Sequence, residues 1–248
     1  DVAELLGTVK TVNGPIMANR VLSCVQKVYA WAVKNPKISD IKFNPSRDVE
    51  RPSPEVERER VYNEVELRAL WKDFAKRGAL GTVYKIVLVT GQRLGEVVGM
   101  EWSEIDGDIW TIPGVRIKNK RIHVVPLSEL ATELIEAQRG RHDRFVFPSP
   151  TKKEAHIYPA SKIAGDVKKG SKVTDFRSHD LRRTMSTEST RLGFSRFLVD
   201  RLLNHTEQGV GRVYDRHDYL KEKTEITDAW ARRLRNIIAG GKVVQISR

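Results

Sequence analysis

A charged, proline-containing stretch divides this sequence into two parts and so limits how the chain can fold. Residues 47–60 read RDVERPSPEVERER, in which Pro52 and Pro54 stand among charges of both signs. Proline donates no backbone hydrogen bond and charged side chains are rarely buried, so the stretch predicts an exposed linker. We therefore expect residues 1–46 and residues 61–248 to fold as separate domains.

The part before the linker has a helical pattern. Apolar residues recur every three or four positions, at Val21, Val25, Val28 and Ala32. Pro15 suits the first turn of a helix, and the Asn-Pro pair at 35–36 ends it. One pair of helices is too small for a complete domain, so we expect residues 1–46 to belong to a larger helical module.

Residues 61–248 combine helical patterns with short strands. Helices are expected at residues 63–74, 80–90, 128–135, 159–169 and about 229–238. The first opens on an Asn63–Glu66 capping box and is expected to end at Gly78. Strands are expected at residues 108–112, 115–118 and 121–125. The predicted fold class is mainly α with a small antiparallel β-sheet (α+β).

The last two expected strands form a basic hairpin. It carries Arg116, Lys118, Lys120, Arg121 and His123. Strand alternation puts Arg116, Lys118 and Lys120 on one face, where they can follow a DNA groove. A lysine with a lowered pKa can also protonate a leaving oxygen here. Equally, lysines on an edge strand can serve only to prevent aggregation.

Arg93 belongs to a second polar motif, TGQRLGEV at residues 90–97. It follows Gly91, where a helix is expected to begin, and Glu96 lies three residues later on the same face. An arginine beside a helix N-terminus can hold a phosphate through two parallel hydrogen bonds. The alternative is a surface ion pair with Glu96, which contributes well under ~1 kcal/mol.

A third group of polar residues begins with the motif SHDLRRT at residues 178–184. Ser178 is expected to cap a helix, on which His179 and Arg182 share one face. Spacing alone does not exclude Arg183 in place of Arg182. A single histidine at a helix start ordinarily has only a capping or hydrogen-bonding role.

Two further motifs, LLNHTE and VYDRHDY, follow within residues 202–219. They supply His205 and, nine residues later, Tyr214. A lone tyrosine is ordinarily a buried residue with one hydrogen bond. Arginines, imidazoles and a phenol in one stretch instead indicate chemistry on a phosphate, with tyrosine as the nucleophile.

The net charge indicates the class of partner. The chain has 44 Lys and Arg against 32 Asp and Glu, a formal net charge of +12, which favours a polyanion such as nucleic acid. No apolar run approaches the roughly 20 residues that span a bilayer. With no visible signal peptide and Cys24 as the single cysteine, we expect a soluble intracellular protein. The six histidines lack paired-ligand spacing, so no metal is expected.

Taken together, these motifs resemble the tyrosine recombinases, and within them the integrases of prophages and genomic islands. Five segments agree in order across about residues 90–219: TGQRLGEV, RIKNKRIHVVPLS, SHDLRRT, LLNH and VYDRHDY. The resemblance implies that residues 61–248 form a catalytic domain with a tail at 241–248. It implies that residues 1–46 are the end of a DNA-clamping core-binding domain, joined by the linker at 47–60.

The resemblance assigns the phosphate-binding residues. Arg93 and Arg182 would grip the scissile phosphate, since the family pattern H-x-x-R selects Arg182 over Arg183. His179 and His205 would assist proton transfer and hydrogen-bond the phosphate oxygens.

It also assigns the reacting groups. Tyr214 would be the nucleophile, with Tyr219 as a weaker candidate, and Lys118 would be the general acid for the 5′-oxygen. Asn204 departs from the pattern, because a glycine commonly precedes the second histidine. Further DNA contacts are expected from Arg116, Lys120, Arg121 and Arg183.

The activity implied by the resemblance is site-specific recombination of double-stranded DNA through a 3′-phosphotyrosyl intermediate, which integrates or excises a mobile element. The implied partners are attachment-site DNA, a homotetramer assembled on it, and accessory DNA-bending or directionality proteins, in the bacterial cytoplasm at the nucleoid. No cofactor is implied, because the phosphotyrosyl link conserves the bond energy. Two alternatives stay open: a type IB topoisomerase, and a non-covalent regulator that reads DNA with a helix-turn-helix at residues 184–205.

Overall fold

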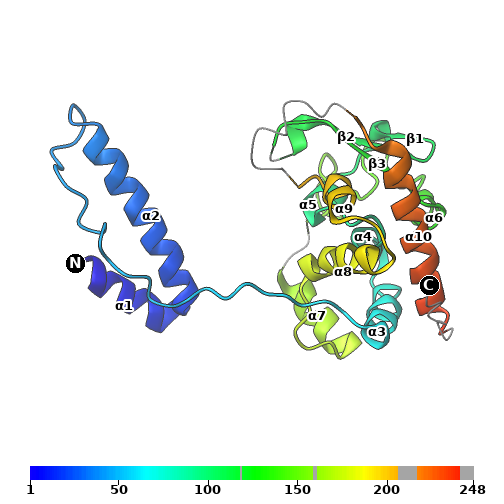
Figure 1. Cartoon of the computed structure of the whole chain (residues 1–248), viewed down its shortest axis with the longest axis horizontal. Helices are drawn as coiled ribbons and strands as arrows, with labels where there is room; N and C mark the ends of the chain where they lie inside the picture. The colour runs from blue at the N-terminus through cyan, green and yellow to red at the C-terminus, as the bar shows by residue number, and fades with distance from the viewer. Residues whose placement is uncertain (118, 159–160, 206–216, 241–248) are drawn as a thin grey trace. The chain divides into compact units, whose positions relative to one another are not determined.

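The computed structural model describes residues 1–248 except 118, 159–160, 206–216 and 241–248 (Figure 1). The chain divides into two compact units, residues 1–59 and residues 60–248. No helix in the described part of the chain is long and apolar enough to cross a membrane.

The first unit contains two packed helices, α1 (Val2–Asn13) and α2 (Pro15–Lys34). Pro15 begins α2, where its missing amide hydrogen leaves no hydrogen bond unmade. The buried side chain of Asn19 donates to the Ser53 carbonyl (2.8 Å) and accepts from the Ser53 amide (3.2 Å). Part of the stretch expected to be an exposed linker therefore binds α2.

The second unit is mainly helical. Its helices are α3 (Glu64–Phe74), α4 (Gly78–Thr90), α5 (Leu94–Val98), α6 (Glu129–Glu136), α7 (Ser161–Ser171), α8 (Ser178–Arg191), α9 (Arg196–Leu202) and α10 (Leu220–Ile238). A three-stranded antiparallel sheet is formed by β1 (Ile105–Asp106), β2 (Ile109–Ile112) and β3 (His123–Pro126), in that order. The expected fold class is confirmed.

Helix α4 lies at the centre of the second unit. Its residues from Val83 to Thr90 are buried except for Lys85, and it packs against α3, α6, α8 and α10 (Figure 1). The indole of Trp230 on α10 donates to the Leu88 carbonyl (2.8 Å), which ties the last helix to this core. Because α4 is buried on nearly every side, it fixes the position of the turn that follows it, and that turn carries Arg93.

One expected strand is wrong. In place of a strand at residues 115–118, Gly114–Arg116 form a short 3₁₀ turn, and β3 pairs instead with β2, with Ile112 opposite His123. The turn is closed by the Arg116 amide, which donates to the Pro113 carbonyl (3.0 Å). Basic residues at alternating positions are typical of a strand, but the hydrogen bond from the Arg116 amide to the Pro113 carbonyl forms a turn here instead.

The side chain of Arg116 has partners within the fold. Its guanidinium forms an ion pair with the buried carboxylate of Glu104 and donates to the Glu96 carbonyl (2.6 Å). Only 19% of the Arg116 side chain is exposed. Arg116 therefore holds the sheet region to α5, and its expected contact with DNA stays a prediction.

Three helix ends also differ from expectation. Gly78 begins α4 rather than ending α3, and Arg177 rather than Ser178 is the N-cap of α8. Helix α10 begins at Leu220, well before residue 229. Its buried face includes the polar residues Lys223 and Thr227, which hide the apolar period in the sequence.

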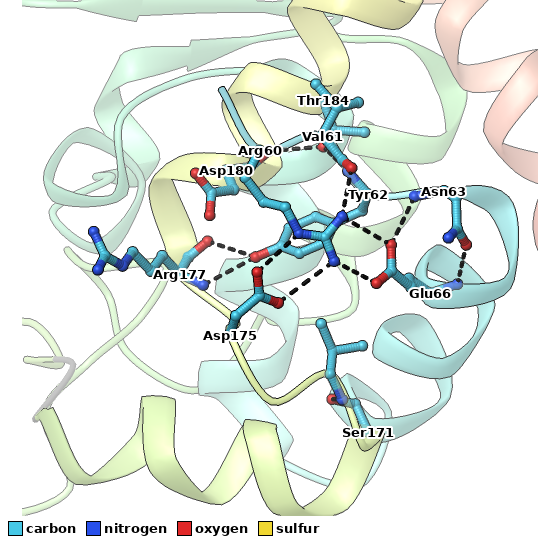
Figure 2. A network of polar contacts seen from close by, with 11 residues as sticks. Arg60, Val61, Tyr62, Asn63, Glu66, Ser171, Asp175, Arg177, Asp180 and Thr184 are labelled. Atoms are coloured by element: carbon cyan, nitrogen blue, oxygen red, sulfur yellow. Dashed lines mark hydrogen bonds and ion pairs between the residues drawn. The ribbon is translucent and has the colours of Figure 1, made fainter. Parts of the chain in front are cut away.

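The chain enters the second unit through a polar network around Arg60 and Tyr62 (Figure 2). The Nε of Arg60 donates to Oδ2 of Asp175 (2.9 Å), and the Tyr62 amide donates to Oγ1 of Thr184 (3.0 Å). The Tyr62 hydroxyl donates to the Arg177 carbonyl (3.0 Å) and accepts from the Arg177 amide (2.9 Å). This network anchors the start of α8, the helix that carries His179 and Arg182.

Removing the Tyr62 hydroxyl tests this anchor. Tyr62→Phe takes away the acceptor of the Arg177 amide and one donor to the Arg177 carbonyl, which keeps its bond from the Asp180 amide. We therefore expect the free energy of unfolding to fall by about 1–2 kcal/mol. Urea unfolding measures the change, with the exposed Tyr158→Phe as matched control. Equal stability of the two variants would show that the hydroxyl does not anchor α8.

Candidate functional site

Arg93 is placed by a tight turn at the end of α4. Gly91 ends the helix in the left-handed region (φ 69°), and a Cβ on it would lie 2.7 Å from Cδ2 of Leu203. Only glycine fits there. The Arg93 amide and Nη1 then each contact the Glu96 carboxylate at 2.8 Å. The ion pair expected as the alternative therefore exists, but 38% of the Arg93 side chain stays exposed.

Arg182 lies one turn into α8 and is almost fully buried. Nη1 donates to the Gly91 carbonyl (2.8 Å) and Nη2 donates to the Leu203 carbonyl. Burial, and then the charge of Arg93, lower the pKa of Arg182 to about 10, so it remains a cation at neutral pH. Arg183 points elsewhere and pairs with Oδ1 of Asp180 (2.5 Å). The structure thus brings Arg182, and not Arg183, beside Arg93.

His205 follows the C-terminal end of α9. Its Nδ1 lies 2.8 Å from Oδ1 of Asp200. Burial holds the pKa of His205 below its usual value, although the Asp200 hydrogen bond opposes this. A neutral ring that donates from Nδ1 to a carboxylate leaves Nε2 as a proton acceptor.

Asn204 explains how this turn forms without the usual glycine. Its φ is 52°, in the left-handed region that asparagine tolerates better than most residues. Its Oδ1 also accepts from Nδ2 of Asn119 (2.8 Å), in the loop before β3. The departure from the family pattern therefore preserves the backbone shape and adds a side-chain link.

Two substitutions at Asn204 separate these effects. Asn204→Gly and Asn204→Ala both lose the link to Asn119, but only alanine is strained at positive φ. We expect the alanine variant to unfold more easily than the glycine variant by about 1 kcal/mol. Urea unfolding of both proteins provides the comparison, and equal stabilities would contradict the conformational explanation.

His179 joins the two arginines at a small pocket. The pocket is lined by Arg93, His179 and Arg182, with Gln92 beside them. Burial, and then Arg182, lower the pKa of His179, so the imidazole is mostly neutral at neutral pH. Among the described residues, no group of three His, Cys, Asp or Glu could hold a metal ion.

The remaining candidates are divided between described and undescribed parts of the chain. Lys118 and Tyr214 lie outside the described residues. Arg121 lines a second pocket together with His205. Lys120, the residue before Arg121, is exposed. Tyr219 lines that pocket too, and its ring packs edge-on against Phe197 (5.4 Å between centroids).

Two buried residues of the site were missed from the sequence. Gln92 is fully buried and His123, which we had counted with the basic hairpin, is 5% exposed. Strand alternation with the apolar Val125 was the available signal for His123, because residues two apart share a face. For Gln92 the sequence carries no such signal.

The model of the phage integrase family matches residues 63–221, a range that contains all six candidate catalytic residues. This chain belongs to that family. Prophage integrase IntA of Escherichia coli K12 is 32% identical over 151 residues, which are 58% of this chain and 36% of IntA. Prophage integrase IntZ of the same strain is 28% identical over 182 residues, 71% of this chain and 45% of IntZ. The chain thus spans less than half the length of these two relatives.

A solved structure shares the fold of this chain. A structure of lambda integrase, as a tetramer bound to a Holliday junction, is similar with a TM-score of 0.63 at 15% identity. The match covers 83% of this chain and 63% of the lambda integrase chain. The family match over residues 63–221 confirms the expected phage-type tyrosine recombinase family.

Proposed function

We propose that residues 61–248 are the catalytic domain of a site-specific DNA recombinase that cuts and rejoins strands through a tyrosine–DNA bond. The observation that carries this proposal is the convergence of Arg93, His179 and Arg182 on one pocket. Two fixed guanidinium groups suit a phosphodiester whose negative charge grows in the transition state. The net charge of +12 supports a nucleic acid as the substrate.

The proposed reaction exchanges one ester for another. The Tyr214 oxygen forms a bond to phosphorus, and its proton passes to an imidazole, for which Nε2 of His205 is suited. The bond from phosphorus to the 5′-oxygen breaks, and Lys118 supplies the proton to that oxygen. A second 5′-hydroxyl then attacks the 3′-phosphotyrosyl group and releases the tyrosine. One phosphorus–oxygen bond forms as another breaks, so the step consumes no ATP.

The proposed partners follow from the family. Lambda integrase has been found as a tetramer on a Holliday junction, and we extend that assembly on attachment-site DNA to this chain. Residues 1–46, which the linker at 47–60 joins to the catalytic domain, would clamp the duplex. Further DNA contacts would come from Lys120, Arg121 and Arg183. Accessory DNA-bending or directionality proteins would decide between integration and excision.

The buried position of Arg182 weighs against a non-covalent reader. A helix-turn-helix at residues 184–205 would leave the arginines without a function, yet Arg182 is buried and still carries a charge. Burying a charged side chain costs free energy, and the interaction with a bound phosphate would offset this cost.

The proposal is tested by capturing the covalent intermediate. Nicked duplexes with a randomised central sequence are incubated with the protein in EDTA, and protein-linked DNA is recovered under denaturing conditions and sequenced. We expect an adduct on a narrow set of sequences. An adduct on all sequences would favour a type IB topoisomerase, and no adduct would contradict both enzymes.

A further inference from the structure

A buried polar cluster connects three segments of the site. Nε2 of His123, on β3, lies 3.0 Å from the Leu202 carbonyl and 3.2 Å from Oε1 of Gln92. The side-chain nitrogen Nε2 of Gln92 donates to the same Leu202 carbonyl (3.1 Å) and to the Thr90 carbonyl (3.1 Å). The cluster therefore joins the turn after α4, strand β3 and the end of α9.

The hydrogen bonds define the state of the histidine. Both neighbours of Nε2 are acceptors, so this nitrogen carries the ring proton. Burial, and then the nearby Lys223, lower the pKa of His123 to about 3, with Arg182 and Arg93 acting in the same direction. The ring is thus a neutral donor at every physiological pH.

The carbonyl that receives these bonds is one of three in succession. Leu202 accepts from Gln92 and His123, Leu203 accepts from Arg182, and Asn204 accepts from Nη2 of Arg93 (3.5 Å). The last carbonyls of a helix have no partner within it and carry partial negative charge. The end of α9 is therefore held by both arginines and by the cluster, directly before His205.

We propose that Gln92 and His123 are positioning residues, which hold the last turn of α9 so that Arg93, Arg182 and His205 keep their places around the phosphate. Both act through the Leu202 carbonyl. A displacement of that carbonyl would move the next two, and with them the guanidinium groups. The inference rests on the proposed recombinase reaction.

The test compares a loss of the donor with a loss of packing. His123→Leu removes the donor at nearly constant volume, His123→Gln restores an amide donor near Nε2, and Gln92→Leu removes the other donor. Val125→Ala, on the same face of β3 and fully buried, is the packing control. Single-turnover adduct formation is measured on a duplex selected by the wild-type protein, at a temperature where every variant is folded.

We expect His123→Leu and Gln92→Leu to slow adduct formation by roughly 10- to 100-fold with little change in DNA affinity. His123→Gln should recover most of the rate, and Val125→Ala should keep it. The double variant His123→Leu with Gln92→Leu should be little slower than either single variant, because both act on one carbonyl. If His123→Leu and Val125→Ala have equal rates, the cluster is only part of the core and the inference is overturned.

A DNA-free measurement keeps this inference separate from the proposed reaction. The measurement is the pKa of His205, which NMR can follow. Burial, Arg182 and Arg93 lower this pKa, while Asp200 raises it. Loosening the end of α9 should move this pKa towards its ordinary value in His123→Leu but not in Val125→Ala. An unchanged pKa of His205 would overturn the positioning role, whereas a wild-type protein that forms no adduct would overturn the proposed reaction alone.

Discussion

Tyr214→Phe is expected to abolish the covalent protein–DNA adduct while leaving DNA binding intact. The substitution keeps the aromatic ring but removes the oxygen that would bond to phosphorus, so the first step loses its proposed nucleophile. Adduct formation on a labelled, nicked duplex is read on a denaturing gel, and DNA affinity is read by fluorescence anisotropy.

Tyr219→Phe is the matched control for this change. The Tyr219 ring packs against Phe197 and the residue caps α10, which indicates a structural role. We therefore expect Tyr219→Phe to keep the adduct. An adduct that persists in Tyr214→Phe and disappears in Tyr219→Phe would move the nucleophile.

Arg182→Lys should be the most damaging charge-preserving substitution. The planar guanidinium of Arg182 donates to the Gly91 and Leu203 carbonyls from two nitrogens and can still face a phosphate. The single ammonium group of lysine cannot make all of these contacts. Losing a donor to the developing charge typically lowers the rate by about 10²–10³, and we expect a fall of at least this size in single-turnover cleavage.

Arg183→Lys provides the control, since it makes the same chemical change one residue along α8. Arg183 pairs with the buried carboxylate of Asp180 while 30% of its own side chain stays exposed, and lysine can keep such a pair. We expect its cleavage rate to stay within a few-fold of the wild type. Equal losses in the two variants would contradict the assignment of Arg182 as the phosphate clamp.

The sequence predicted the features that depend on local order. The helical periods, the capping box at Asn63 and the proximity of Arg93 to Glu96 all appear in the structure, because each involves residues within one or two turns. The choice of Arg182 over Arg183 needed the family pattern, since spacing on a helix permits both.

What the sequence could not predict depends on contacts between distant segments. Arg116 was expected on a DNA-facing strand, but Glu104 and the Glu96 carbonyl hold it in the fold. The role of Gln92 depends on the Leu202 carbonyl, 110 residues away along the chain. Neither partner can be identified from the periodicity of its own segment.

Mapping the DNA-linked peptide tests the central claim most directly. Trypsin cleaves after Arg212, Arg216 and Lys221, so Tyr214 falls in the peptide VYDR and Tyr219 falls in HDYLK. After nuclease treatment of the wild-type adduct, mass spectrometry should find the residual nucleotide on VYDR, attached to Tyr214. A nucleotide on HDYLK, or on any residue that is not a tyrosine, would contradict the proposed mechanism.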